Sequence, residues 1–129
     1  MMPIVDMLVQ HAKKEKMSMH MPGHKAGMLF SYSHPFLTEE YSSFLRNLAE
    51  VAKHDVTETL GVDSLHDPKG AILKAMELTA STYGAASSFF LVNGSTCGVH
   101  AMIYSSFRRG DTVFVSSDCH MSVFNALMV

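Results

Sequence analysis

The stretch LVNGSTCGVH, residues 91–100, changes from strand-like to helix-like sequence and decides the predicted fold. The apolar run SSFFLV that overlaps its start is typical of a buried β-strand, and apolar residues at helical spacing follow it. Gly94 and Gly98 would let a ligand approach the backbone here, and the hydroxyls of Ser95 and Thr96 lie between them. A helix start presents free N–H groups and the positive end of the helix dipole, so this turn is a candidate anion site.

A structural and a functional interpretation of this turn both stay open. Ser and Thr are ordinary residues at a helix start, and Asn93-Gly94 is an ordinary turn sequence. The turn is not a Walker A loop, because no Gly-Lys-Ser/Thr follows, and it lacks the three-glycine fingerprint of a dinucleotide site. If the turn binds a ligand, phosphate is the anion that fits best.

Strand-like and helix-like segments alternate on both sides of this turn. Apolar periodicity predicts further helices at 1–16, 38–53 and 71–83 and one that starts near residue 121, while TVFVS at 112–116 predicts a second buried strand. Pro and Gly predict loops between the first three helices. Such an alternating chain favours an α/β fold with a mostly parallel sheet, preceded here by an N-terminal helical segment. Such a sheet normally has more strands than this chain supplies, so we expect it to be incomplete.

Composition and charge narrow the functional class. The chain has 129 residues, so we expect at most one domain. Its net charge is −2 and its ten Lys and Arg residues are scattered, so we expect no nucleic acid partner. No apolar run approaches the roughly 20 residues that span a bilayer, and no secretory signal is present, so we expect a cytoplasmic protein without a membrane partner. Cys97 and Cys119 are more typical of apolar core residues than of a disulfide.

The predicted strand at 112–116 ends in SSDCHMS, which places His120 and Ser122 on a neighbouring strand-to-helix loop. Because the carboxyl ends of parallel strands meet at one edge of a sheet, this loop should lie near Gly94. The imidazole of His120 could stack on a planar ring, bind a metal or act as an acid or base. A solvent-facing histidine at a helix start is the structural alternative.

Metal binding is not expected in this chain. His20 and His24 have the spacing of a metal-binding pair on a helix, but Pro22 and Gly23 between them disfavour a regular helix. The DCH sequence around His120 is too compact to form a tetrahedral site by itself. We therefore predict no metal site.

Five blocks of the sequence carry a family resemblance. They are HMPGHKAG (20–27), DVTETLGVDSLHDPKGAI (55–72), YGA (83–85), FFLVNGSTCG (89–98) and GDTVFVSSDCHMSV (110–123). Together they resemble the N-terminal part of the large domain of the pyridoxal-phosphate-dependent ornithine/lysine/arginine decarboxylases. The resemblance implies the aspartate-aminotransferase-like fold (fold type I), a three-layer, mostly parallel sheet that this chain would contain only in part. Residues 1–36 would form an N-terminal helix and active-site-mouth loop, and 37–129 the first, truncated part of the cofactor-binding domain.

The resemblance also implies site residues. The turn after residue 93 matches the family's phosphate-binding turn, and His120 matches the histidine that stacks on the cofactor ring and is the expected catalytic residue. His24 and Lys25 are expected on the substrate side or at a partner subunit. Asp55 and Asp63 belong to acidic motifs of the family, for which bracing of loops is the favoured role. The cofactor contacts implied are Ser95, Thr96, Cys97, His120 and Ser122.

The implied function is decarboxylation of lysine, arginine or ornithine to a diamine or polyamine and carbon dioxide, with pyridoxal 5′-phosphate as cofactor. The partners implied are a small amino acid substrate and further copies of the chain, in a dimer or larger homo-oligomer. The sequence offers no basis for choosing among the three amino acids.

The chain departs from the family pattern around His120. Ser117, Asp118 and Met121 stand where the family usually has Arg, Asn and Lys, and none of the seven lysines follows His120. The Schiff-base lysine of the family lies further along the chain than Val129, so we expect these residues alone to be inactive. A non-catalytic remnant or partner subunit, and another fold type I enzyme such as an aminotransferase or lyase, stay open as alternatives.

Overall fold

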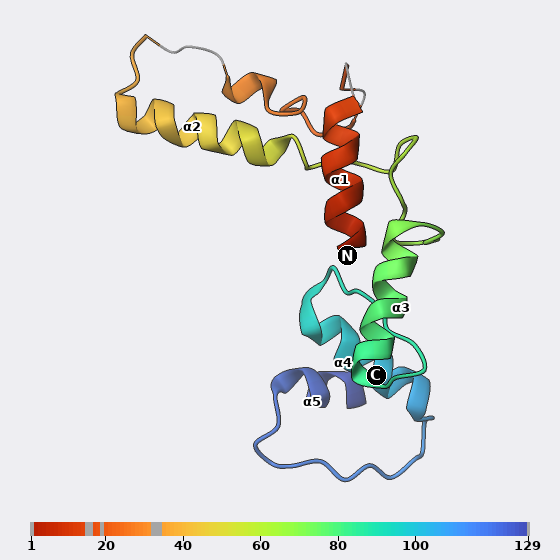
Figure 1. Ribbon diagram of the computed structural model, residues 1–129. Coiled ribbons are helices and arrows are strands. Elements are labelled where there is room, and N and C mark those ends of the chain that lie inside the picture. The colour runs from red at the N-terminus through yellow and green to blue at the C-terminus, as the bar shows by residue number, and fades with distance from the viewer. Residues whose placement is uncertain (1, 15–16, 19, 32–34, 129) are drawn as a thin grey trace. The chain divides into compact units, whose positions relative to one another are not determined.

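The computed structural model describes residues 2–14, 17–18, 20–31 and 35–128. Within these residues the elements are α1 (Pro3–Lys14), the 3-10 helix η1 (Met28–Phe30), α2 (Glu39–Ala52), α3 (Ala71–Tyr83), α4 (Gly94–Ser106) and α5 (Met121–Leu127) (Figure 1). They belong to two compact units, Met1–Ser88 and Phe89–Val129. In the first unit α1 packs against α3 and α2 against η1, and in the second α4 packs against α5.

The predicted helices are confirmed within the described residues; residues 1, 15 and 16 of the helix predicted over 1–16 lie outside them. Local signals specify several helix ends. Thr38 is the N-cap of α2, and its side chain accepts a hydrogen bond from the backbone N–H of Tyr41. Gly84 ends α3 in the left-handed conformation (φ 64°), and its N–H donates to the carbonyl of Ala80. No helix in the described part of the chain is long and apolar enough to cross a bilayer.

The predicted α/β fold, an incomplete three-layer and mostly parallel sheet of fold type I, is wrong for this structure. The described residues form helices and irregular segments, with no strand among them. The segments 87–92 and 112–116, which were expected to be buried strands, are unpaired, and Phe89 and Phe114 are 79% and 96% exposed. A strand persists only when a neighbour satisfies its backbone N–H and C=O groups, and neither segment has such a neighbour. An apolar run therefore indicates that a segment can be buried, but it does not indicate that a neighbouring strand is present to pair with it.

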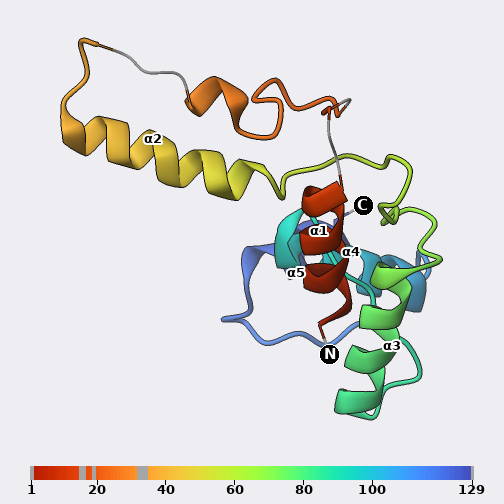
Figure 2. The same cartoon turned by 45° about the horizontal axis from the view of Figure 1, so that its top comes forward.

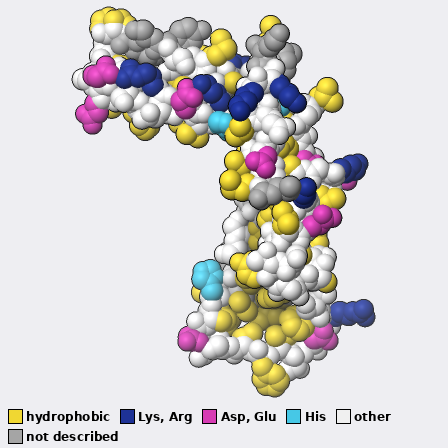
Figure 3. Space-filling model, in the orientation of Figure 1, with side chains coloured by type: hydrophobic (Ala, Val, Ile, Leu, Met, Phe, Trp, Pro, Cys, Tyr) yellow, Lys and Arg dark blue, Asp and Glu magenta, His cyan; other side chains and the backbone are white. Residues whose placement is uncertain are grey.

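Buried residues are few, and most of them are small. The buried hydrophobic residues come from every α-helix except α1 and are Ala49, Ala52, Met76, Ala80, Ile103 and Ala126. Two polar residues, His20 and Ser122, are also buried. Many larger apolar side chains lie at the surface (Figure 3). The structure is thus held by small contact areas, in which individual polar interactions carry more weight than in a large core.

The two helices of the second unit lie side by side and start at the same end. α4 and α5 are in contact, and both Figure 1 and Figure 2 show them running in the same direction. Ile103 of α4 and Ala126 of α5 are buried. This packing positions the start of α4 and the start of α5, which carry the predicted cofactor contacts.

Candidate functional site

The start of α4 leaves its backbone N–H groups uncapped. The N-cap residue Asn93 makes no side-chain hydrogen bond to the helix, and Gly94 adopts a left-handed conformation with φ 67°. A Cβ added at Gly94 would meet no atom within 4 Å, so the space beside it is open. Ser95, Thr96 and Cys97 are all exposed. Unpaired N–H groups, two hydroxyls and the positive end of the helix dipole therefore face solvent, an arrangement that can hold an anion.

Gly98 has a different role from the one expected from the sequence. Instead of opening the backbone to a ligand, it is covered by Leu91, whose Cδ1 would lie 2.6 Å from an added Cβ. The absence of a side chain thus lets the segment before α4 fold back onto the helix. Of the two glycines in the turn, Gly94 alone borders open space.

The imidazole of His120 caps α5. Its Nδ1 accepts a hydrogen bond from the backbone N–H of Ser122 (3.2 Å) and lies 2.9 Å from the Ser122 hydroxyl oxygen. A backbone N–H can only donate, so Nδ1 is the acceptor and the proton of the neutral ring is on Nε2. Ser122 is 4% exposed, whereas His120 is exposed. One ring nitrogen is therefore anchored to a buried serine while much of the imidazole is accessible.

An ionised carboxylate lies close to His120 in the sequence. The Ser116 hydroxyl donates a hydrogen bond to the carboxylate of Asp118. This bond, together with one from the backbone N–H of Asp118 itself, outweighs the small effect of burial and lowers the pKa of Asp118. The loop before α5 therefore carries a negative charge at neutral pH, where the family usually has an uncharged Asn.

In the first unit, His24 joins two of the sequence blocks. Its Nε2 lies 3.0 Å from a carboxylate oxygen of Asp55, and its Nδ1 accepts a hydrogen bond from the backbone N–H of Gly27 (3.4 Å). The ring of Phe30 stacks on the imidazole, with the ring centroids 6.1 Å apart. The contact braces the loop over residues 20–27 against the segment that follows α2, in agreement with the structural role expected for Asp55.

Lys25 lies in a left-handed turn and anchors the same loop. Lys25 (φ 47°), Ala26 (φ 54°) and Gly27 (φ 84°) are consecutive left-handed residues, a strained arrangement for the first two. The Lys25 ammonium donates to the carbonyl of His20 (2.9 Å). A Cβ at Gly27 would lie 2.4 Å from the carbonyl oxygen of Ala49, so only glycine allows this close contact with α2.

A buried histidine contact was missed at the sequence level. His20 Nε2 lies 2.9 Å from His11 Nε2, and His20 Nδ1 accepts a hydrogen bond from the backbone N–H of Thr57 (3.0 Å). In the sequence, His20 stands out only through its spacing from His24 and as the first residue of the block HMPGHKAG. Thr57 lies 37 residues from His20, so no local pattern could have indicated the contact. Among the described residues, no cluster of three or more His, Cys, Asp or Glu could hold a metal ion.

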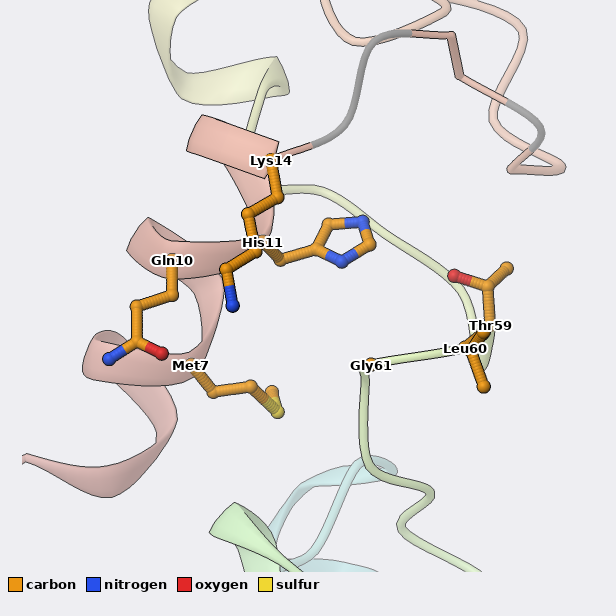
Figure 4. A pocket seen from close by; sticks show the side chains of 7 residues that line it. All are labelled: Met7, Gln10, His11, Lys14, Thr59, Leu60 and Gly61. Atoms are coloured by element: carbon orange, nitrogen blue, oxygen red, sulfur yellow. The ribbon is translucent and has the colours of Figure 1, made fainter.

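A cavity of about 470 Å³ lies between α1 and the loop over residues 59–61 (Figure 4). His11 extends from α1 toward Thr59 across this space, and the remaining lining residues are Met7, Gln10, Lys14, Leu60 and Gly61. A second cavity of similar size is lined by Lys25 and Lys53 together with Ala12, Met17, Ser18, Ala26 and Met28. Neither cavity includes the predicted cofactor contacts, which lie at exposed helix starts.

Asp63 organises the loop before α3. Its carboxylate accepts four backbone hydrogen bonds, from Ser64, Lys69 and Gly70 (each 3.0 Å) and Ile72 (2.8 Å). Burial alone would raise the pKa of Asp63, but these four bonds outweigh it, and the pKa is lowered. The N-cap Gly70 has no side chain to cap α3, so Asp63 satisfies the helix start from seven residues upstream. This geometry agrees with the loop-bracing role expected from the sequence.

The predicted site residues fall into both units. Ser95, Thr96, Cys97, His120 and Ser122 lie at the common starting end of α4 and α5 (Figure 2). His24 and Lys25 lie in the unit Met1–Ser88.

Known proteins resemble this chain over nearly its whole length. It is 43% identical over 125 residues to the uncharacterized protein YaaO of Bacillus subtilis, a match that covers 97% of this chain and 24% of that protein. An arginine decarboxylase of Bacillus anthracis is 31% identical over 98% of this chain and 24% of its own length. The lysine decarboxylase LdcA of Pseudomonas aeruginosa is 28% identical over 98% of this chain and 16% of its own length. No solved structure matches significantly.

The chain thus spans a quarter or less of the length of these relatives. A sequence model of one family, described as Orn/Lys/Arg decarboxylase, major domain, matches residues 2–129. The matched region contains the uncapped start of α4 and the histidine cap of α5. The chain therefore belongs to the Orn/Lys/Arg decarboxylase family.

Proposed function

We propose that this chain is part of a pyridoxal-phosphate-dependent decarboxylase of a basic amino acid and that the start of α4 binds the phosphate of the cofactor. The observation that carries the proposal is the uncapped helix start at Gly94, within a sequence that the family matches from residue 2 to 129. Arginine and lysine decarboxylases among the relatives support a basic amino acid as substrate.

The residues at the start of α4 suit a phosphate. The Ser95 and Thr96 hydroxyls and the backbone N–H of Cys97 are the proposed donors, because all three residues are exposed and no Asn93 side chain occupies the helix start. Gly94 borders open space, so a phosphate could approach the backbone without displacing a side chain.

His120 is proposed to cover one face of the cofactor ring. Its bonds to Ser122 fix the orientation of the imidazole, so that little side-chain freedom would be lost when the ring stacks. Ser122 thus acts mainly by positioning His120. When bound, pyridoxal phosphate supplies the electron sink for the bond that breaks as carbon dioxide leaves.

The remaining assignments are part of the same proposal. Residues 1–36 form the region near the active-site mouth, with His24 and Lys25 on the substrate side or at a partner subunit, and residues 37–129 begin the cofactor-binding domain. The enzyme works in the cytoplasm as a homo-oligomer. None of the seven lysines of this chain binds the cofactor covalently in the enzyme, and the 129 residues alone do not decarboxylate.

Binding of pyridoxine 5′-phosphate to the 129-residue chain tests the phosphate site. This probe lacks the aldehyde, so it cannot react with lysines, and calorimetric or NMR titration would report the non-covalent contacts alone. We expect weak binding, with a dissociation constant on the order of millimolar. Ser95→Ala and Thr96→Ala should each weaken it several-fold, while Ser106→Ala at the other end of α4 serves as the matched control. Unphosphorylated pyridoxine should bind far more weakly.

The ring contact is tested separately with His120→Asn. Asparagine can still accept the hydrogen bond at the start of α5 but offers no aromatic ring, so it should weaken binding of pyridoxine phosphate without unfolding α5. Equal binding by the chain and all these variants would contradict the proposed site. A borohydride-stable adduct of pyridoxal phosphate on a single lysine of the chain would contradict the proposal that none of the seven is the covalent lysine.

The charge of Asp118 favours a second candidate function, a non-catalytic member of the family that binds the cofactor poorly. An ionised carboxylate in the loop before α5 would repel a phosphate held at the starting end of the two helices, and the hydrogen bond from Ser116 favours the ionised form by lowering the pKa of Asp118. Asp118→Asn should therefore strengthen binding of pyridoxine phosphate, most clearly at low salt. No change in this variant would remove the support for the non-catalytic alternative.

A further inference from the structure

The ends of α4 and α5 border a cavity that the proposed cofactor site does not use. Its volume is about 320 Å³, and its lining comes from α4, α5 and the segment between them, all within the unit Phe89–Val129. The predicted cofactor contacts lie at the starts of the same two helices, so the cavity is at the other end of the helix pair. A cavity of this size is at the lower end of the range of small-molecule sites in proteins.

One part of the cavity wall is apolar. Ile103 of α4 and Ala126 of α5 line it and are 6% and 3% exposed. Phe107 and Val113 also line it and add an aromatic ring and a branched side chain, both of which are partly accessible. A ligand with an apolar portion would therefore cover surface that water otherwise contacts.

Charged residues of both signs line the same cavity, and they come from a single turn. These residues are Arg108, Arg109 and Asp111. The backbone N–H of Arg108 donates to the Asp111 carboxylate (2.7 Å), and the backbone N–H of Asp111 donates to the Arg108 carbonyl (3.0 Å). Gly110 completes the turn in a left-handed conformation with φ 98°. The two hydrogen bonds fix the backbone from which the charged side chains extend.

The charges on this turn do not pair with one another. Within the residues that the structure describes, neither Arg108 nor Arg109 takes part in an ion pair or a side-chain hydrogen bond. A guanidinium stays protonated and presents a planar fork of N–H donors that matches a carboxylate. The Asp111 carboxylate accepts a backbone N–H instead, and the end of α4 adds partial negative charge to the same cavity.

We propose that this cavity binds an α-amino acid with an apolar side chain. Arg108 and Arg109 bind its carboxylate, while Asp111 and the end of α4 bind its ammonium group. Its side chain packs on Ile103 and Phe107. A simple anion would face Asp111 and a simple cation would face two arginines, so a zwitterion fits this lining better than either. Both ligand charges lie on one carbon atom because the residues of one turn lie within about 7 Å of each other.

This ligand differs in class from the substrate of the proposed decarboxylase. The apolar wall and the two arginines disfavour a basic side chain, because its positive charge would be repelled and would lose water without gaining a partner. The inference does not depend on the proposed decarboxylase function, and its tests involve no cofactor.

Methyl NMR of the 129-residue chain, titrated with L-leucine, tests the proposal with Ile103 and Val113 as reporters in the cavity. We expect both signals to shift together, with a dissociation constant on the order of millimolar. L-leucinamide lacks the carboxylate and 4-methylpentanoate lacks the ammonium group, and each should bind several-fold more weakly than leucine. Glycine, which has both charges but no side chain, should also bind more weakly. Unchanged signals at tens of millimolar leucine, or equal binding by 4-methylpentanoate, would overturn the proposal.

Single charge changes assign the two ends of the ligand. Arg109→Gln should weaken binding of both leucine and 4-methylpentanoate several-fold, because both carry the carboxylate. Asp111→Asn keeps a side-chain oxygen that can accept the Arg108 N–H, so it should weaken leucine binding and leave 4-methylpentanoate bound at least as tightly. Arg46→Gln removes the same charge in the unit Met1–Ser88 and is the matched control, with unchanged affinity expected. Unchanged affinity for leucine in either Arg109→Gln or Asp111→Asn would contradict the site.

Discussion

A glycine lies at the start of both α3 and α4, Gly70 as the N-cap of α3 and Gly94 as the first residue of α4, but the backbone N–H groups of the two helix starts differ in whether they have a partner. At α3 the carboxylate of Asp63 accepts the N–H groups of Gly70 and Ile72 and two more in the loop. At α4 the side chain of Asn93 makes no such bond, and the residues of the first turn are exposed. One helix start is filled by an anion of the protein itself, and the other is left open.

This difference separates a structural helix start from a candidate binding site. A helix start has unsatisfied N–H groups and a positive dipole end whatever its sequence, so these features alone do not indicate a ligand. What distinguishes α4 is that the protein supplies no internal partner, although Asn93 is a residue type that often does so. Variants at the two helix starts should therefore differ in their effects on stability and on phosphate binding.

Removing the Asp63 carboxylate should have the largest effect on the free energy of unfolding. Asp63→Ala leaves four backbone N–H groups without their acceptor, and we expect it to lower the free energy of unfolding by about 2 kcal/mol. Urea denaturation followed by circular dichroism would measure the loss, and hydrogen exchange at Ile72 would localise it to the start of α3. Asp67→Ala, which removes an exposed carboxylate from the same loop, is the control and should change the free energy of unfolding by less than about 0.5 kcal/mol. Equal effects of the two variants would show that Asp63 does not close this helix start.

Lowering the pH should remove the stabilisation that the ionised Asp63 carboxylate provides. The pKa of Asp63 is lower in the folded chain than in an unfolded one, so its ionised form stabilises the fold. This contribution is complete above the unfolded pKa of about 3.9 and is lost as pH falls through the folded pKa. We expect the free energy of unfolding to fall less steeply below pH 4 for Asp63→Asn than for the unmodified chain. Parallel pH profiles for the two would contradict the assignment.

Backbone strain introduced at Gly94, at the open start of α4, should have a smaller effect on stability. Gly94 has φ 67° and open surroundings, so Gly94→Ala should cost about 1 kcal/mol of stability through backbone strain alone. Gly84→Ala is the matched control, because Gly84 has φ 64° and also borders open space. The two variants should lose similar stability in urea denaturation, but only Gly94→Ala should weaken binding of pyridoxine phosphate. Equal binding by both would argue against a ligand at α4.

Converting the open start into a closed one should have the smallest effect on stability. Asn93→Asp places a carboxylate at the N-cap of α4 and should stabilise the chain by about 0.5 kcal/mol, the usual size of a helix-dipole interaction at an exposed position. The same carboxylate should compete with a bound phosphate and weaken pyridoxine phosphate binding in titrations. Asn125→Asp, near the end of α5, is the control for the added charge and should leave binding unchanged. If Asn93→Asp binds pyridoxine phosphate as well as the unmodified chain does, the open start of α4 no longer supports a phosphate site there.

Local sequence predicted the helices of this protein, and it did so for reasons that lie within a few residues of each helix. The spacing of apolar residues in α2, the cap at Thr38 and the left-handed Gly84 all act within one or two turns. The residues of the open α4 start, Asn93, Gly94 and the two hydroxyls that follow, were also recognisable from the sequence, and anion binding there stays a prediction. The family was recognisable from five separate blocks and is confirmed by the match over residues 2–129.

Contacts between distant residues lay outside what the sequence could determine. The apolar run around Phe89 predicted a strand, but a strand needs a partner to satisfy its backbone, and whether a partner exists is a property of the three-dimensional arrangement. The closing of Gly98 by Leu91, the contact of His20 with Thr57 and the capping of α3 by Asp63 likewise depend on how the chain folds back. The helices, the family and the residues of the open turn could be read from the sequence, because they follow from short-range periodicity and residue type. Which helix start has an internal hydrogen-bond acceptor and which apolar segments lack a strand partner became evident only from the folded chain, because both depend on groups that folding brings together.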